Sequence, residues 1–450
     1  MISSGVNTRE LILEILLQIE EEGEHSHIAI RNALSKYQFL PKQERSFITR
    51  VCEGTLEYRI YIDYVIDSFS KVSVNKMKPQ IREILRSAVY QLKFMDSVPD
   101  SAVCNEAVKL AVKHRFQGLK GFVNGVLRTI SREKEHISFE NPAMRFSVPD
   151  WMYDKWVRDW GEERAEIIAA SFLEPRPTWV RCNESTVPVS QILKSLQEEG
   201  AGAECMEGFD SMIALWGYDY LEGLNAFLEG WIQVQDISSS LVGQLAAPKK
   251  GDIIIDVCAA PGGKSLHLAD QLKRTGLVEA RDLTEQKVSL IEDNIARCGL
   301  TNIQTKVWDA TVFDPSSEEK ADIVIADLPC SGMGIIGRKP DIKYHMTEES
   351  LKALEELQRQ ILSVVWRYVK PGGTLIYSTC TINKGENEKN ASWIRGNLPF
   401  EPVDIRGKLP EGWEAASSAS LQEGQIQILP GIGPWKEFDG FFISVFKRRG

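Results

Sequence analysis

The sequence predicts a multidomain protein with an all-helical N-terminal domain, a small α+β module and a C-terminal α/β domain. In the first 135 residues, apolar positions recur with the 3.6-residue period of helices, and almost no strand pattern interrupts them. From about Gly251 onward, short apolar runs alternate with helical patterns, which is typical of a doubly wound parallel sheet. A chain of 450 residues also exceeds the size of one ordinary core. We therefore expect domains at residues 1–140, 141–235 and 236–450.

The elements of the first two domains follow from periodicity and from capping residues. Thr8 is expected to cap the first helix, whose apolar positions continue to Ile19. The proline-containing stretch 141–149 marks the end of the helical domain. The further helices expected are 28–34, 44–58, 81–95, 102–112, 121–130, 151–160, 164–170 and 189–198, and the strands are 178–182 and 212–216.

The C-terminal domain alternates strands with helices. We expect its last helix to end at Lys370-Pro371-Gly372-Gly373, because this sequence is a helix terminator. The apolar run near the C-terminus would add an antiparallel edge strand. The strands expected are 252–257, 277–280, 303–308, 322–326, 374–377 and 440–447, and the helices are 266–273, 285–297 and 351–369.

The composition is that of an ordinary globular protein, with 43% hydrophobic and 26% charged residues. No apolar run approaches the length of a membrane span, and the N-terminus lacks the apolar stretch of a signal peptide. The eight cysteines include no Cys-x-x-Cys pair and the six histidines have no ligand spacing, which argues against a metal site. We expect a cytoplasmic monomer with free thiols.

Charge is unevenly distributed along the chain. Residues 1–140 contain 20 Lys/Arg and 18 Asp/Glu, a net charge of +2, whereas the remaining residues contain 33 and 45, a net charge of −12. This asymmetry favours the region 71–134, with Lys109, Lys113 and Arg115, as the place where a phosphate backbone docks. The alternative is a solvated helical face, which is the more common origin of a charge run.

Two cysteines are the strongest functional signal in the chain. Cys330 follows the apolar run 323–326 and the residues Asp327-Leu328-Pro329, and Cys380 follows the run 374–377. The carboxyl ends of parallel strands face the ligand crevice, so both thiols are expected there beside the Asp327 carboxylate. A single free cysteine is more often a small buried hydrophobe. Two cysteines at matching strand ends instead favour a functional site. Together with the nearby carboxylate, they would provide a nucleophile, a proton-handling group and a base-recognition group.

A second site is expected where the first strand of the sheet turns into a helix. The turn 256–265 is rich in small residues and glycine, which let the backbone approach a ligand closely. It matches neither the P-loop nor the dinucleotide-binding pattern, which argues against ATP and NAD. Asp282 and Asp309 follow the next two strands. A carboxylate at the second strand end is the usual partner of a ribose diol, although each acid alone could equally be a cap or turn residue.

These segments resemble the RNA cytosine-5 methyltransferases, which are S-adenosylmethionine-dependent enzymes of the Rossmann type. The resemblance covers about residues 230–450, and the helical region is similar to NusB-type RNA-binding domains. Together the two parts resemble the bacterial 16S rRNA cytosine-5 methyltransferases of the B type over nearly the whole chain. The chain departs from the family pattern at Leu328, Met333, Tyr344 and Gly431. The matching segments are Ala29–Ala33, Arg45–Ile48, Phe122–Arg128, Cys258–Lys264, Asp327–Gly332, Ser378–Thr381 and Glu386–Glu388.

The resemblance implies the roles of the site residues. Cys380 is the implied nucleophile on carbon 6 of cytosine, Cys330 assists loss of the carbon-5 proton and release, and Asp327 binds the base. The implied partner is 16S rRNA with an unstacked or single-stranded cytosine. The implied contacts to S-adenosylmethionine come from Cys258, Ala259, Ala260, Pro261, Gly262, Gly263, Lys264, Asp282, Asp309 and Asp327. Phosphate contacts are expected from Arg338, Lys339 and Lys343 unless these residues belong to a solvated loop.

Two other functions and one other assignment of the nucleophile stay open on the sequence alone. An amino-nitrogen methyltransferase typically has Asn/Asp-Pro-Pro-aromatic, where this chain has Asp-Leu-Pro-Cys. A non-enzymatic RNA-binding factor is disfavoured by the two intact cysteines. Cys330 could be the nucleophile, as in DNA cytosine-5 enzymes with a Pro-Cys motif, but the Thr-Cys motif favours Cys380. The sequence identifies neither the modified nucleotide nor whether free rRNA or an assembled subunit is the substrate.

Overall fold

The computed structural model describes residues 6–23, 26–409, 419–433 and 437–450. The chain forms two compact units: unit 1 is Met1–Leu173 with Ile336–His345, and unit 2 is Glu174–Ile335 with Met346–Gly450. These units are coarser than the three domains expected from the sequence, whose limits at 140 and 235 stay predictions. Within the described ranges, we find no helix that is both long and apolar enough to cross a membrane.

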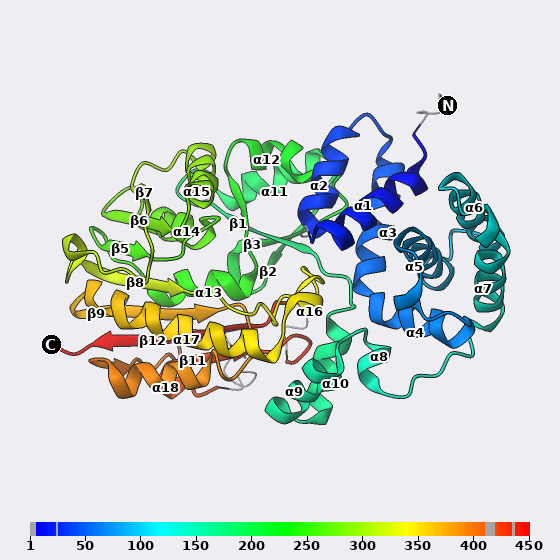
Figure 1. Cartoon of the computed structure of the whole chain (residues 1–450). Helices are drawn as coiled ribbons and strands as arrows, with labels where there is room; N and C mark the ends of the chain where they lie inside the picture. The colour runs from blue at the N-terminus through cyan, green and yellow to red at the C-terminus, as the bar shows by residue number, and fades with distance from the viewer. Residues whose placement is uncertain (1–5, 24–25, 410–418, 434–436) are drawn as a thin grey trace. The chain divides into compact units, whose positions relative to one another are not determined.

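The described part of unit 1 consists of helices and loops without strands (Figure 1). Asn7 caps the first helix through its side chain, which accepts hydrogen bonds from the amides of Arg9 and Glu10, so the expectation of a Thr8 cap is wrong. The helices are α1 (Thr8–Glu22), α2 (Ser26–Lys36), α3 (Lys42–Glu57), α4 (Arg59–Phe69), α5 (Pro79–Phe94), α6 (Asp100–Lys113), α7 (Lys120–Glu133), α8 (Pro142–Arg145), α9 (Asp150–Trp160), α10 (Glu162–Ser171) and α16 (Ile342–His345).

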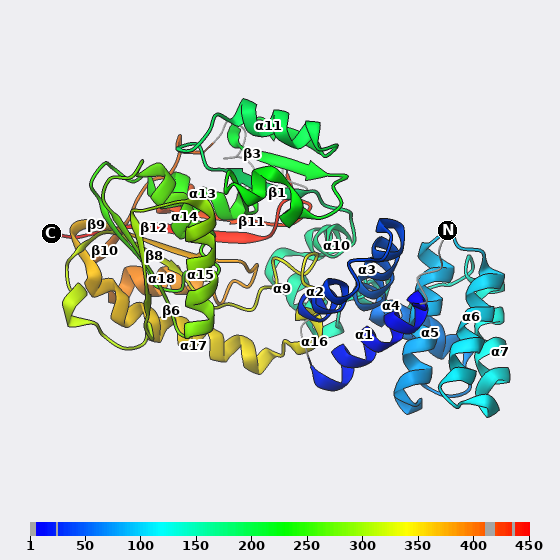
Figure 2. The same ribbon diagram turned by 90° about the horizontal axis from the view of Figure 1, so that it is seen from above.

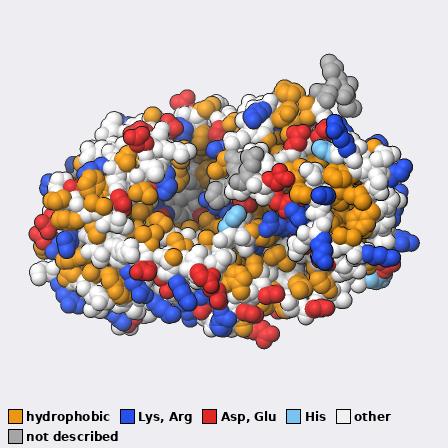
Figure 3. All heavy atoms as spheres, in the orientation of Figure 1, with side chains coloured by type: hydrophobic (Ala, Val, Ile, Leu, Met, Phe, Trp, Pro, Cys, Tyr) orange, Lys and Arg blue, Asp and Glu red, His pale blue; other side chains and the backbone are white. Residues whose placement is uncertain are grey.

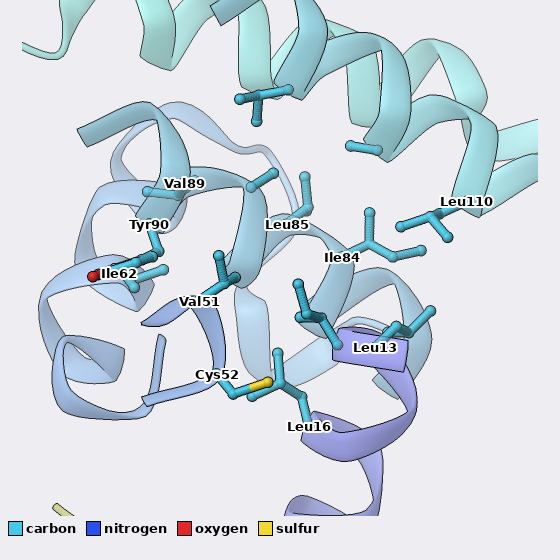
Figure 4. Packing of buried hydrophobic residues seen from close by; sticks show 14 of the residues in the cluster. Leu13, Leu16, Val51, Cys52, Ile62, Ile84, Leu85, Val89, Tyr90 and Leu110 are labelled. Carbon is cyan, nitrogen blue, oxygen red and sulfur yellow. The ribbon is translucent and has the colours of Figure 1, made fainter. Parts of the chain in front are cut away.

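Helix α5 forms the centre of the core of unit 1. It packs against α1, α3, α4, α6 and α7. Figure 4 shows Ile84, Leu85 and Val89 of this helix among side chains of the neighbouring helices. Apolar residues with a helical period thus form one shared core, as the sequence predicts.

The segment Ile336–His345 belongs to unit 1, although the residues on either side of it belong to unit 2. The side-chain nitrogen of Lys343 is buried within unit 1, and it donates hydrogen bonds to the carbonyls of Glu57 (2.6 Å) and Ser147 (2.8 Å). Burial lowers the pKa of Lys343 to about 7. The expectation that Lys343 holds a phosphate is therefore wrong, because its side chain is committed to the protein interior.

The smaller sheet of unit 2 is antiparallel, with strand order β2-β3-β1-β4. Helix α11 (Val189–Glu198) covers it with Ile192 and Leu196. This is the α+β module that the sequence predicts, with two further strands that the sequence did not indicate. The strands are β1 (Thr178–Cys182), β2 (Gly202–Met206), β3 (Phe209–Trp216) and β4 (Ile232–Val234).

The larger sheet has eight strands in the order β10-β12-β9-β8-β5-β6-β7, and β11 also pairs with β12. Strands β5 to β9 are mutually parallel, and β12 is antiparallel to its neighbours. The expectation of an edge strand at the C-terminus is wrong, because β12 lies between β9 and β10. The strands are β5 (Ile253–Asp256), β6 (Leu277–Asp282), β7 (Ile303–Val307), β8 (Ala321–Asp327), β9 (Val369–Thr379), β10 (Phe400–Pro402), β11 (Gln425–Ile428) and β12 (Phe441–Arg448).

Helices cover both faces of the larger sheet (Figures 1 and 2). In β8, Ile323 and Ile325 join the core under the first helical layer, whereas Val324 and Ala326 join the core under the second. The result is the doubly wound Rossmann-type arrangement that the sequence predicts. The first layer is α13 (Ile237–Ala246), α14 (Gly263–Gln271) and α15 (Glu285–Cys298), and the second is α17 (Glu348–Val365) and α18 (Glu388–Asn397).

Candidate active site

Cys330 and Cys380 lie side by side after two neighbouring parallel strands. Asp327, the last residue of β8, pairs in register with Ser378 of β9. The two loops that leave these strands bring the Sγ atoms of the cysteines to 3.3 Å from each other. Both thiols are half-buried. The strand ends thus place two sulfur atoms and one carboxylate at the same edge of the sheet.

The two thiols differ in their electrostatic surroundings. The hydrogen bond with Cys380 is the main cause that raises the pKa of Cys330 well above its usual value, and burial and the Glu386 carboxylate add to it. Cys330 is therefore a neutral thiol, in hydrogen-bond contact with the sulfur of Cys380.

The Asp327 carboxylate is held by two side chains. Its Oδ2 accepts a hydrogen bond from the ammonium of Lys264 (2.7 Å), and its Oδ1 accepts one from the hydroxyl of Ser378 (2.7 Å). Burial acts to lower the pKa of Lys264, but the charge and the hydrogen bond of Asp327 raise it above its usual value overall. Lys264 is thus a cation aimed at Asp327. Sequence reasoning missed Ser378, although it stands directly before the Thr-Cys motif.

Gly334 fixes the end of the Cys330 loop against two other segments. Its amide donates to the carbonyl of Cys380 (3.1 Å), and its own carbonyl accepts a hydrogen bond from the amide of Gly440 (2.8 Å). A Cβ atom at position 334 would lie 2.0 Å from the Gly440 carbonyl oxygen. Only glycine allows this close approach of the backbones.

The turn Cys258–Lys264 connects β5 with α14, as expected. Gly262 has φ +105°, a conformation that L side chains rarely adopt. The Ala260 amide donates to the carboxylate of Asp282 (2.9 Å). Burial raises the pKa of Cys258, so its thiol is neutral. The residues 258–263 of this turn thus present small, uncharged groups at the end of β5.

The two acids after β6 and β7 have different surroundings. Asp282 is buried, and its Oδ1 accepts the amide of Leu283 (2.8 Å) and pairs with Lys287 (3.1 Å). Asp309 is exposed, and its Oδ1 accepts hydrogen bonds from the amide (2.8 Å) and hydroxyl (2.7 Å) of Thr311. Asp309 therefore closes a turn. Leu283, whose side chain is largely exposed beside Asp282, is an apolar contact surface that sequence reasoning did not single out.

S-adenosylmethionine carries a sulfonium, an ammonium group and a nucleoside. The surroundings of Asp256 indicate whether these residues fit such a ligand. Asp256 is buried at the end of β5, where burial raises its pKa to about 7. One oxygen accepts the Ser265 hydroxyl (2.6 Å), and Oδ1 has no partner among the described residues. An unpaired buried acceptor, a turn of small residues and the exposed Leu283 fit such a ligand.

The basic residues expected to bind RNA are exposed, and two of them have acidic partners. Lys109 pairs with Glu106 at 2.7 Å, and Lys113 pairs with Glu10. Arg115 is exposed just after α6, and Arg338 and Lys339 are exposed in the segment Ile336–His345. Figure 3 shows basic and acidic side chains interspersed over the visible face. The basic stretch of the sequence is thus partly neutralised in the fold.

Comparisons with known proteins identify all three parts of the chain. Sequence profiles described as 16S rRNA methyltransferase RsmB/F, NusB family and RsmF/B-like ferredoxin-like domain match residues 243–447, 6–132 and 148–217. The probable ribosomal RNA small subunit methyltransferase B of Bacillus subtilis is 34% identical over 99% of both chains, and ribosomal RNA small subunit methyltransferase B of Klebsiella pneumoniae is 29% identical over 99% of both. The crystal structure of PH0851 is 25% identical, with a TM-score of 0.81 over 99% of both chains. The chain therefore belongs to the ribosomal RNA small subunit methyltransferase B family, whose members use S-adenosylmethionine.

Proposed function

We propose that the chain methylates carbon 5 of a cytosine in 16S rRNA through a covalent bond between Cys380 and carbon 6. The observation that carries this proposal is the pair of thiols 3.3 Å apart beside the Asp327 carboxylate. Carbon 5 of cytosine is a weak nucleophile, and addition of a thiolate to carbon 6 makes it enamine-like. A site for methylation of an exocyclic nitrogen has no need for two sulfur atoms.

The first step is the attack of Cys380. Its thiol gives its proton to solvent and its sulfur forms the bond to carbon 6. The electrons of the C5–C6 double bond move to the C4–C5 bond, those of the C4–N3 double bond move to N3, and N3 takes up a proton from water. Asp327 accepts hydrogen bonds from N3 and the amino group, and Lys264 holds the carboxylate in place. When bound, S-adenosylmethionine would supply an electrophilic methyl group to carbon 5, and the electrons of the broken carbon–sulfur bond would stay on the thioether that leaves.

The second step is release. The sulfur of Cys380 is now a thioether. Cys330 gives its own proton to solvent and takes the proton from carbon 5. The electrons of that carbon–hydrogen bond restore the ring double bond, the bond between Cys380 and carbon 6 breaks, and N3 returns its proton.

The cofactor and RNA contacts follow the same proposal. The turn Cys258–Lys264, Asp282 and Asp309 would hold S-adenosylmethionine, and Asp282 would accept hydrogen bonds from the ribose hydroxyls. The substrate is a cytosine that is unstacked or flipped, because the two thiols are half-buried. Phosphates of the RNA contact Arg338 and Lys339, which follow the Cys330 loop in the chain, and also Lys109, Lys113 and Arg115.

Trapping of the covalent intermediate tests the proposal. Cys330→Ala should methylate but release slowly, so a protein–RNA band that nuclease removes should appear on a denaturing gel with S-adenosylmethionine and unmodified 16S rRNA. Cys380→Ala should give no band and no methylation. Cys104→Ala is the matched control, because Cys104 is a buried thiol in unit 1.

The pattern of bands distinguishes the alternatives. A band in Cys380→Ala but not in Cys330→Ala would make Cys330 the nucleophile. Normal methylation in both variants without a band would rule out a thiol adduct. Bisulfite mapping of rRNA from cells with and without the protein identifies the modified cytosine, and a lack of any change at carbon 5 would contradict the proposed reaction.

A further inference from the structure

Glu386 is a fully buried carboxylate that holds the loop of Cys330. It accepts four hydrogen bonds, and Gln358, one of the donors, also donates to the carbonyl of Pro329 (2.9 Å). The residues on both sides of Cys330 are therefore held through this one carboxylate and its partner. The four donors are the amide (2.9 Å) and hydroxyl (2.6 Å) of Ser331 and the side-chain amides of Asn383 (3.0 Å) and Gln358 (3.0 Å).

Asn387, the next residue, holds the loop of Cys380 in a corresponding way. Its Oδ1 accepts the hydroxyl of Thr379 (2.6 Å), and its Nδ2 donates to the carbonyl of Thr381 (2.9 Å). These two residues stand on either side of Cys380. Asn387 is also fully buried, so its hydrogen bonds do not compete with water.

The two loops are also joined directly. The hydroxyls of Ser331 and Thr381 lie 2.7 Å apart. The dipeptide Glu386-Asn387, directly before α18, thus hydrogen-bonds to a neighbour of each cysteine. Burial of a carboxylate is costly unless donors surround it, which is what Ser331, Asn383 and Gln358 provide.

We propose that Glu386 and Asn387 are positioning residues for different steps of the reaction. Glu386 holds Cys330 for removal of the carbon-5 proton, and Asn387 holds Cys380 for attack on carbon 6. The inference rests on the proposed function and deepens it. Small displacements of a reacting group from its productive geometry have large effects on the reaction rate. Because Glu386 and Asn387 hold the residues next to each cysteine, each of them can control the rate of one step.

Single-turnover reactions that separate adduct formation from release test this inference. Glu386→Gln keeps the volume of the side chain but brings an amide among four donors. We expect release to slow by about tenfold to a hundredfold, adduct to accumulate, and affinity for S-adenosylmethionine to stay unchanged. Asn387→Ala should instead slow adduct formation by about tenfold or more without accumulation of adduct.

Two milder variants test the same inference if Glu386→Gln or Asn387→Ala does not fold. Ser331→Ala removes one donor to Glu386, and Thr379→Val removes one donor to Asn387 without a change of shape. They should show the same two phenotypes in weaker form. Asn302→Ala is the matched control, because Asn302 is a buried amide of unit 2 whose side chain bonds to the carbonyl of Ala269 (2.9 Å) and not to these loops. It should leave the ratio of the two rates unchanged.

The outcomes separate this inference from the proposed function. If Cys330→Ala traps no adduct, the proposed covalent attack by Cys380 itself fails. If Cys330→Ala traps an adduct but Glu386→Gln or Ser331→Ala releases it like the unmodified chain, only the role of Glu386 is overturned. If Asn387→Ala or Thr379→Val forms adduct at the normal rate, the role of Asn387 is overturned. Equal slowing of both steps in all variants would indicate a shared structural role and contradict the division.

Discussion

Replacement of Lys343 by methionine should flatten the dependence of unit 1 stability on pH. Burial lowers the pKa of Lys343 to about 7, against an ordinary value of 10.5. The unfolded chain therefore binds this proton more readily than the folded chain. The stability associated with a neutral Lys343 is fully present above pH 10.5 and is lost progressively as the pH falls toward 7.

The size of the effect follows from this window. Each pH unit within it changes the free energy of unfolding by about 1.4 kcal/mol. From pH 9.5 to pH 7.5 the wild-type chain should lose about 2.7 kcal/mol through Lys343, and Lys343→Met should not. The variant also loses the hydrogen bonds to the Glu57 and Ser147 carbonyls. That loss lowers stability at both pH values and cancels when the two are compared.

Hydrogen exchange of α3 and α5 peptides in increasing urea measures the stability of unit 1 separately from unit 2. The control is Lys339→Met, which removes an exposed lysine of the same segment and should keep the wild-type pH dependence. If Lys343→Met and the wild-type chain lose the same free energy between pH 9.5 and pH 7.5, Lys343 is protonated in the folded state and the reasoning is refuted.

Three further predictions concern the cofactor, the RNA and the Cys330 loop. Asp282→Asn should weaken binding of S-adenosylmethionine by about 1.5–3 kcal/mol, the usual value of hydrogen bonds to a charged group, and unchanged affinity in calorimetry would remove Asp282 from the site. Charge reversal of Lys109, Lys113 and Arg115 together should weaken RNA binding and flatten its salt dependence, whereas Lys194→Glu in unit 2 should do neither; an unchanged salt slope would mean a solvated face. Gly334→Ala should reduce methylation with normal cofactor affinity, because its Cβ would collide with the Gly440 carbonyl, and full activity would show that the loop adjusts.

Most of the larger sheet could be predicted because its parallel strands are continuous apolar runs between turns. Helix α4 was missing from the predicted elements and the predicted end of α17 was wrong, each for a physical reason. Helix α4 has several β-branched and aromatic residues that weaken its local signal, and its position depends on packing of Ile62, Val65 and Ile66 against the core. The Lys370–Gly373 sequence resembles a helix end, yet α17 ends at Val365 and β9 already begins at Val369, which pairs with Ala321.

In the site, too, features that depend on the local sequence could be predicted, and contacts between residues far apart in the chain could not. The positions of Cys330 and Cys380 could be predicted because each follows an apolar strand, and neighbouring parallel strands end at one edge. The contacts of Glu386 could not, because its donors come from positions 331, 358 and 383, and no local period relates them. The Glu-Asn-Glu motif was visible in the sequence, but its partners depend on how α17 packs beside the two loops.

Lys264 shows how adjacency in the sequence can hide a second role. It follows Gly262-Gly263, so sequence reasoning assigns it to the cofactor turn. In the fold, β5 lies next to β8, and the side chain of Lys264 reaches the carboxylate of Asp327 at the end of that neighbouring strand. The residue that closes the proposed cofactor turn therefore also orients the group proposed to bind the base. A substitution that shifts the start of α14 should then disturb base binding as well as cofactor binding, because one ammonium group links the two sites.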